Sequence, residues 1–189
     1  MNASSAAAHI APSEDAATTL ARWEAEEHAA RARMAPGGVA TPDQLRGLTG
    51  LQWLEAIGRG ELPAVTVSES MNLWPISVAA GRVVFQGRPD ARYLNPMGTV
   101  HGGWIAALLD SAVGCVVLST LPAAKGFTTV ELKISYLRAI ALPQTPLVRA
   151  EATIINAGRM VGFAEARLVG PDGKLYAHAT TTCVVLDRP

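Results

Sequence analysis

The stretch WIAALLDSAVGCVVL, residues 104–118, decides the fold of this 189-residue chain. Asp110 and Ser111 are its only strongly polar residues, and apolar residues occur on every side of the helix that the stretch would form. A helix that is apolar all round is buried inside a protein rather than laid on its surface. The sequence therefore predicts one long buried helix with other elements wrapped around it.

Strand patterns occupy the chain on both sides of this helix. Residues 83–85 are expected to form part of a hairpin before it, and four further strands are expected after it, at residues 127–140, 147–156, 160–169 and 175–186. Turn-forming Pro, Gly, Asn and Asp residues separate these four strands, so we expect them to be joined by consecutive hairpins. Consecutive hairpins make an antiparallel sheet. The sequence thus predicts an α+β fold in which a curved antiparallel sheet wraps around the long helix.

The first of these four strands alternates between polar and apolar residues. Val130, Leu132 and Ile134 share one face, which we expect to contact the helix. Thr128 is in phase with them, whereas Thr129 is out of phase. The alternation therefore predicts that Thr128 faces the helix and that Thr129 points away from it.

A helical extension, residues 1–45, is expected ahead of the main domain at residues 46–189. Ser13 is the expected N-cap of a helix that runs to about Met34. Because this helix is rich in alanine, we expect it to dock weakly or to swing free, and removal of residues 1–40 should leave a folded, active protein. Capping-box spacings predict two further helix starts, at Thr41–Gln44 and Thr49–Gln52.

Composition excludes several classes of protein. Hydrophobic residues make up 49% of the chain and charged residues 17%, which excludes a disordered protein. Sixteen Lys and Arg residues balance sixteen Asp and Glu residues, so no basic surface is expected to bind nucleic acid. No apolar run reaches the length of a membrane span, and early acidic residues do not fit a secretory signal. Cys115 and Cys183 lie among apolar residues in the sequence, which is typical of reduced thiols in a protein core. Because reduced thiols are typical of cytosolic proteins, we expect a cytoplasmic protein.

A candidate site lies at the beginning of the long helix and at its centre. His101-Gly102-Gly103 precedes the helix, and two glycines at a helix start leave N–H groups that a carbonyl oxygen can approach. Asp110 is a carboxylate among apolar neighbours, and burial of its charge is costly unless it is hydrogen-bonded or opens on a polar cavity. A structural aspartate bonded to nearby backbone is the plainer interpretation. The glycines and the carboxylate together indicate an acyl-transfer site.

The spacing within this site has a consequence for assembly. Gly102 and Asp110 are eight residues apart, which is about 12 Å along a helix. One small thioester carbonyl cannot touch both groups at that distance. If both act, the glycines of one subunit must meet the aspartate of another, which predicts a site shared across a dimer interface.

These motifs resemble those of the hotdog-fold acyl-CoA thioesterases of the phenylacetate-pathway (PaaI-like) family. The resemblance covers about residues 48–186, and its most specific part is the spacing from His-Gly-Gly to the aspartate. It is carried by Asn95-Pro96-x-Gly98-x-x-His101-Gly102-Gly103, Asp110, Thr128-Thr129-x-Glu131-Leu132, Gly158-Arg159 and Gly173-Lys174-Leu175-Tyr176-Ala177.

The resemblance implies hydrolysis of acyl-CoA by a homodimer with shared sites, with two dimers paired into a tetramer and with no metal or other cofactor. It implies that Asp110 acts as general base or nucleophile and that the Gly102 N–H is the oxyanion donor. Asn95 would orient water or thioester, His101 would position the loop, and Thr128 would lie near the carboxylate. Substrate-binding roles fall to Gly103, Trp104, Thr129 and Arg159, with Trp104 lining an acyl tunnel and Arg159 meeting a phosphate of CoA.

Two other functions stay open at this point. The first is a non-catalytic module that binds or senses acyl-CoA, against which the expected buried Asp110 speaks, because a pure binder needs no such acid. The second is a hotdog dehydratase, whose chemistry pairs a histidine with an acid at a different spacing. The sequence does not choose among aryl-acetyl, medium-chain and polyketide-like acyl groups. No three His, Cys or carboxylate residues have plausible metal-ligand spacing.

Overall fold

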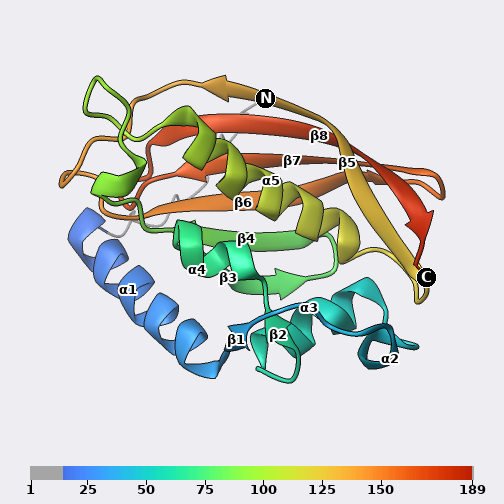
Figure 1. Cartoon of the computed structure of the whole chain (residues 1–189). Helices are drawn as coiled ribbons and strands as arrows, with labels where there is room; N and C mark the ends of the chain where they lie inside the picture. The colour runs from blue at the N-terminus through green and yellow to red at the C-terminus, as the bar shows by residue number, and fades with distance from the viewer. Residues whose placement is uncertain (1–14, 189) are drawn as a thin grey trace, which may run out of the picture.

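The centre of the fold is helix α5 (Gly102–Leu118), which lies across one face of a six-stranded antiparallel sheet (Figure 1). The computed structural model describes residues 15–188. Leu108, Leu109 and Val113 of α5 are 0% exposed and pack against inward-facing residues of the strands. The predicted hotdog architecture, a curved antiparallel sheet around one long helix, is confirmed.

The sheet has the strand order β3-β4-β6-β7-β8-β5. Its strands are β3 (Leu73–Ala79), β4 (Arg82–Gly87), β5 (Lys125–Tyr136), β6 (Val148–Ala157), β7 (Val161–Val169) and β8 (Leu175–Asp187). The prediction that consecutive hairpins join the four strands after the helix is wrong in one connection, because β5 pairs with β8 at one edge while β6 pairs with β4 and β7. The segment around Leu142-Pro143 is therefore a crossover that leads from the edge strand to the middle of the sheet. Turn-forming residues show where the chain changes direction, but they do not show which strand of the sheet the next strand pairs with.

A bulge in β5 reverses the predicted orientation of two threonines. In the pairing of β5 with β8, Thr129 opposes Cys183 and Glu131 opposes Thr182, so Val130 is an extra residue without a partner. Val130 is 57% exposed. An extra residue in a strand shifts by one position the alternation of side chains between the two faces of the sheet. Thr129 consequently faces α5 and Thr128 is exposed, so the predicted placement of Thr128 is wrong.

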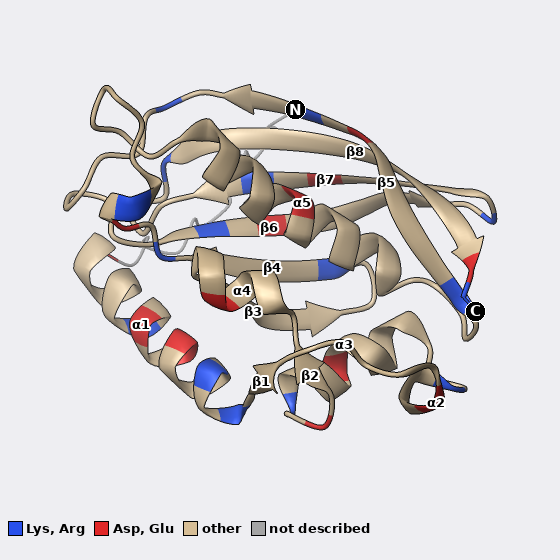
Figure 2. Cartoon of the chain, viewed as in Figure 1, with Lys and Arg blue, Asp and Glu red and all other residues tan. Residues whose placement is uncertain are grey.

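One side of α5 is less buried than the sequence indicates. Gly103 is exposed, and Ala106, Ala107, Asp110 and Ser111 are half-buried. These residues recur at helical spacing and so form one stripe along the helix. Asp110 lies on this stripe and is the single charged residue of α5, on which the ribbon of Figure 2 is coloured red for an acidic residue. The prediction of a helix buried on every side is therefore wrong along this stripe of small residues.

The N-terminal helix α1 (Ala16–Arg33) packs firmly on the sheet. Its N-cap is Asp15, whose carboxylate accepts hydrogen bonds from two backbone N–H groups, and the predicted cap Ser13 lies outside the described residues. Trp23 is 5% exposed and packs against Leu147 and Val169. Their neighbours Val148, the first residue of β6, and Leu168 of β7 belong to the core around α5, so α1 lies on the opposite face of the sheet.

Buried polar contacts hold α1 in place as well. The Glu27 side chain is 5% exposed and accepts hydrogen bonds from Gln86 Nε2 at 2.8 Å and Arg88 Nε at 3.3 Å. Arg149 donates through Nε to Gln86 Oε1 at 2.8 Å and forms an ion pair with Glu26. Through these contacts, a helix with little apolar surface is bonded to side chains of the sheet and of the loop after β4. The prediction that this helix docks weakly is wrong.

The segment between α1 and β3 carries short elements. Both predicted capping boxes are present, at the starts of α2 (Pro42–Leu45) and α3 (Gly50–Gly58). β1 (Ala35–Gly37) and β2 (Pro63–Ala64) form a small parallel pair, and α4 (Thr66–Met71) was not predicted. In the described part of the chain, no helix combines the length and the apolar character needed to cross a bilayer.

Candidate active site

The loop before α5 is held by one asparagine. Asn95 Oδ1 accepts from the backbone N–H groups of Met97 at 2.9 Å and Thr99 at 3.2 Å, and Asn95 Nδ2 donates to Thr99 Oγ1 at 2.9 Å. Gly98 has a φ of +78°, which permits the tight turn that these bonds close. The structure thus brings Asn95 to the site as a loop clamp.

The helix start presents one free donor. His101 is the N-cap of α5, and its Nδ1 accepts a hydrogen bond from the Gly103 N–H at 2.9 Å. The Gly102 N–H, by contrast, has no acceptor among residues 15–188. A free N–H at a helix N-terminus favours an oxygen that carries or develops negative charge. The geometry fits the predicted oxyanion role of Gly102 and leaves Gly103 bound to the cap.

Asp110 is half-buried on the stripe of α5 and is bonded to the edge strand. Thr129 Oγ1 donates to Asp110 Oδ1 at 3.2 Å. The Thr129 hydroxyl thus orients the carboxylate through Oδ1, while Oδ2 accepts no hydrogen bond from the described residues. An oriented carboxylate with one unoccupied oxygen can accept a proton from water or attack a carbonyl carbon.

The two thiols near this carboxylate are poor nucleophiles. Burial and the charge of Asp110 together raise the pKa of the Cys115 thiol to about 12. Burial also raises the pKa of Cys183, which lies on β8 next to Thr129, although hydrogen bonds from two threonines oppose that effect. Since a thiolate is the reactive form, neither cysteine competes with Asp110 at neutral pH.

Gly102 and Asp110 lie on the same unbroken helix. Their eight-residue separation corresponds to about 12 Å along the helix axis. No bend within α5 brings them together, so the two groups of one chain cannot contact one small carbonyl group.

Tyr136 is a neighbour of the free donor that the sequence did not indicate. Its hydroxyl donates to the Gly102 carbonyl oxygen at 3.0 Å, and its ring lies only 3.3–3.4 Å from the position that a Cβ atom on residue 102 would take. Tyr136 also lines a groove of about 330 Å³ beside the helix start, with Val100, Gly102, Ile105 and residues 137–140. It is 34 residues from Gly102 in sequence, and no local pattern relates the two.

Two predicted substrate-binding residues lie elsewhere. Trp104 is 2% exposed, donates through Nε1 to the Met71 carbonyl oxygen at 2.7 Å and stacks on Tyr93, so it belongs to the core rather than to a tunnel wall. Arg159 is exposed at the turn between β6 and β7, near the C-terminal half of α5. Within one chain, the turn between β6 and β7, which carries Arg159, and the beginning of α5 at Gly102 lie toward opposite ends of the helix (Figure 1).

Comparison with known proteins relates this site to one family. The profile of the thioesterase superfamily matches residues 97–177, which include the helix start, Asp110 and Thr129. A phenylacetic acid degradation-related protein of Ralstonia eutropha JMP134 has a solved structure that is 31% identical in sequence, with a TM-score of 0.64. The similarity covers 70% of this chain and 98% of that chain.

Similar proteins also occur in archaea and animals. A Halobacterium salinarum protein named as an esterase is 38% identical over 89 residues, which are 46% of this chain and 56% of the relative's length. Human acyl-coenzyme A thioesterase 13 is 28% identical over 108 residues, which are 57% of this chain and 75% of the human protein. The part of the chain that the thioesterase profile matches contains α5, β5, β6 and β7 and the beginning of β8, but not α1, β3 or β4.

Proposed function

Because the chain belongs to the thioesterase superfamily, a family of thiolester hydrolases, we propose that it hydrolyses the thioester of an acyl-CoA to the free acid and CoA. The observation that carries this proposal is the pairing, on one helix, of a free Gly102 N–H with a half-buried, oriented Asp110 carboxylate. A module that only binds acyl-CoA needs the first group but not the second.

The reaction needs an oxyanion donor and a base or nucleophile. The Gly102 N–H would stabilise the negative charge that develops on the thioester oxygen. As a base, Asp110 would take a proton from the attacking water while a carbon–oxygen bond forms and the carbon–sulfur bond breaks. That proton would then pass to the departing CoA thiolate. As a nucleophile, an Asp110 oxygen would attack the thioester carbon and expel the CoA thiolate, which takes a proton from solvent, and water would hydrolyse the resulting mixed anhydride to the free acid and the Asp110 carboxylate in a second step.

Neighbouring side chains would support these two groups. Thr129 would hold the Asp110 carboxylate in one orientation through its hydroxyl. His101 would keep the Gly103 N–H occupied, so that the Gly102 N–H is the donor offered to the substrate. Asn95 would act by shaping the loop, and Tyr136 by limiting the space beside the oxyanion position.

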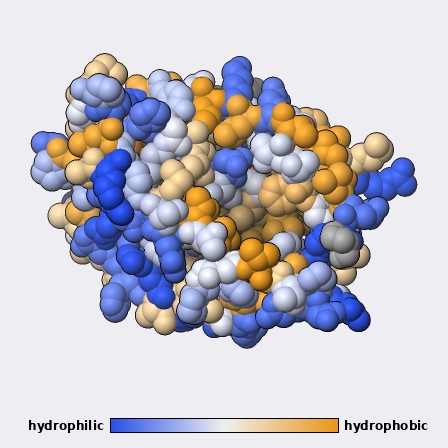
Figure 3. Space-filling model, viewed as in Figure 1, coloured by the Kyte–Doolittle hydropathy of each residue, from blue (hydrophilic) through white to orange (hydrophobic). Residues whose placement is uncertain are grey.

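We further propose that each site is shared by two copies of the chain. The half-exposed stripe of small residues on α5 gives another helix room to approach Asp110 closely. β5 is an edge strand with exposed Val130 and Tyr136, followed by exposed Leu137, and an unpaired edge can accept another strand. Apolar side chains are exposed on the face of the molecule where α5 lies (Figure 3). A two-fold axis there would bring the Gly102 of one copy toward the Asp110 of the other, and two such dimers would pair.

The groove beside Gly102 favours small to medium or aryl acyl groups. Its volume of about 330 Å³ and its apolar residues Val100, Ile105 and Ile140 suit a short chain or a single ring. Longer acyl groups would need additional space from the second copy of the chain.

The test is thiol release from a panel of acyl-CoA thioesters by the full chain and by Asp110→Asn. We expect turnover of at least one small or aryl acyl-CoA and a fall in kcat of at least about 100-fold in the variant, because the base or nucleophile is lost. Asp172→Asn, an exposed aspartate paired with Lys174 in a hairpin, is the matched control and should retain full activity. Turnover unchanged by Asp110→Asn would contradict the assignment.

A further inference from the structure

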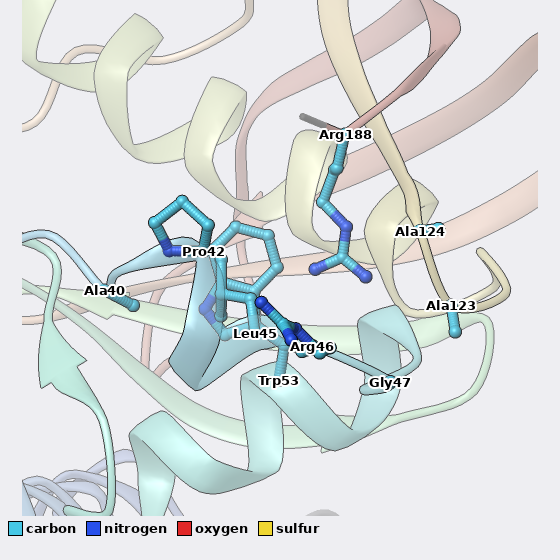
Figure 4. Close-up of a pocket in the computed structure, with 9 residues that line it drawn as sticks. All are labelled: Ala40, Pro42, Leu45, Arg46, Gly47, Trp53, Ala123, Ala124 and Arg188. Atoms are coloured by element: carbon cyan, nitrogen blue, oxygen red, sulfur yellow. The ribbon is translucent and has the colours of Figure 1, made fainter.

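A second cavity lies far from the candidate active site, beyond the C-terminal end of α5. It has a volume of about 600 Å³ and lies between the α2–α3 segment, the loop after α5 and the end of β8 (Figure 4). Most of its wall is apolar, formed by Ala40, Pro42, Leu45, Trp53, Ala123 and Ala124. Only the two alanines at 123 and 124 fall within the residues that the family profile matches, so this cavity is mainly a feature of the flanking segments.

One arginine at this cavity has unused hydrogen-bond donors. Arg188 Nη2 donates to the Leu48 carbonyl oxygen at 2.7 Å, and the guanidinium carbon lies 5.3 Å from the centre of the Trp53 ring. Arg188 Nε and Nη1 are shielded from solvent and have no hydrogen-bond partner among residues 15–188. Buried guanidinium N–H groups without an acceptor are costly, since water no longer solvates them. Figure 4 shows this guanidinium directed from the end of β8 toward Trp53 and Leu45.

The other arginine of the cavity is in a different state. Arg46 forms an ion pair with Asp43, and both side chains are at least 80% exposed. Its charge is therefore already compensated and solvated. In residues 15–188, no acidic side chain pairs with the half-buried guanidinium of Arg188, which lies next to an indole ring and an apolar wall.

From this arrangement we propose that the cavity binds an organic monoanion with one carboxylate on an apolar or aromatic body. The carboxylate would supply acceptors to the Arg188 guanidinium, and a single negative charge would match the single uncompensated cation. The body would lie against Trp53, Leu45 and Pro42. A volume of about 600 Å³ is within the range of small-molecule sites.

This proposal does not depend on the proposed hydrolysis, because its test needs no turnover. The full chain is titrated by calorimetry with octanoate and with 4-phenylbutyrate. Their alcohols, 1-octanol and 4-phenylbutanol, test the need for the charge, and adenosine 3′,5′-bisphosphate tests a phosphate ligand. We expect saturable binding of a carboxylate at one site per chain, with the alcohols at least about 10-fold weaker, as for other sites that pair a buried charge.

Two arginine variants form the matched comparison. Arg188→Gln should weaken carboxylate binding at least about 10-fold, whereas Arg46→Gln should change it less than about 3-fold. Ala123→Phe, which places a ring in the cavity from an exposed turn, should abolish binding and provides a second test if Arg188→Gln does not fold.

Several results would overturn the proposal. These are the absence of saturable carboxylate binding, binding unaffected by Arg188→Gln or by Ala123→Phe, and a preference for the bisphosphate. Loss of binding in Asp110→Asn with retention in Arg188→Gln would place the carboxylate in the candidate active site instead.

Discussion

Thr128 and Thr129 are adjacent and chemically identical, yet only Thr129 contacts the carboxylate of Asp110. The difference comes from Val130, the extra residue of the β5 bulge, which shifts the phase of the strand by one position. At the scale of single residues, the chemistry of the site therefore depends on one irregularity in strand pairing.

The two threonines form a matched pair for mutagenesis. Thr129→Val removes a hydrogen bond to a charged group while keeping nearly the same volume, and such bonds contribute about 1.5–3 kcal/mol. We expect kcat to fall about 10- to 100-fold, because the carboxylate loses its fixed orientation. Thr128→Val should keep wild-type kcat. Steady-state thiol-release kinetics on both variants check this, and equal effects of the two substitutions would contradict the observed orientation.

At the scale of elements, α1 is the unexpected part of the molecule. Its sequence is polar and alanine-rich, but Trp23 and the buried contacts of Glu27 attach it to the outer face of the sheet. Arg31 lies 4.6 Å from the centre of the Trp74 ring on the same face. The helix covers side chains that would otherwise be exposed on β3, β4 and β6.

Loss of this helix should therefore destabilise the protein. We expect Trp23→Ala to lower the free energy of unfolding by about 3–5 kcal/mol, as for other buried aromatic residues. Leu20→Ala, a half-buried position on the same helix, is the control and should cost clearly less. Urea denaturation measures both. A loss below about 1 kcal/mol for Trp23→Ala would mean that α1 docks as weakly as its composition indicates.

The attachment of α1 should also weaken in acid. Burial would raise the pKa of Glu26, but the hydrogen bond and charge of Arg149 outweigh it and hold that pKa below its usual value of 4.5. A carboxyl group with a lowered pKa in the folded state contributes stability above its unfolded pKa, and this contribution is lost as the pH falls through the folded value. Tryptophan fluorescence and thermal unfolding between pH 7 and about pH 3 should show this loss in the wild type. Glu26→Gln should show a smaller acid dependence below about pH 4.5.

At the scale of the whole molecule, the separation of Gly102 and Asp110 requires a second copy if both act on one thioester. Mixing Asp110→Asn subunits with Gly102→Pro subunits is expected to restore activity. Each hybrid dimer would have one site with both defects and one intact site, and so about half the wild-type activity. Proline is favourable at the first position of a helix, so this substitution removes the N–H with little cost to the helix itself.

Two measurements make the mixing experiment decisive. Each parent variant is first shown by size-exclusion chromatography to form the same oligomer as the wild type. Hybrid dimers are then isolated with two different affinity tags before thiol release is measured. Verified hybrids that remain inactive would mean that each site belongs to one chain.

Local patterns in the sequence determined much of this protein. The apolar run of α5, the two capping boxes, the glycines at the helix start and their spacing to Asp110 all depend on residues close to one another in the chain. Their structural consequences follow from helix geometry and backbone hydrogen bonding, so they could be predicted without knowledge of the rest of the fold.

Only the tertiary structure decided which distant residues meet. The edge position of β5, the bulge at Val130, the contact of Tyr136 with Gly102 and the docking of α1 through Glu27 and Gln86 join segments tens of residues apart. Such contacts arise because packing and buried hydrogen bonds select one arrangement among many that local preferences permit. For that reason the sequence indicated Asp110 and the candidate oxyanion donor Gly102, but the contact of Thr129 with the carboxylate emerged only from the folded chain.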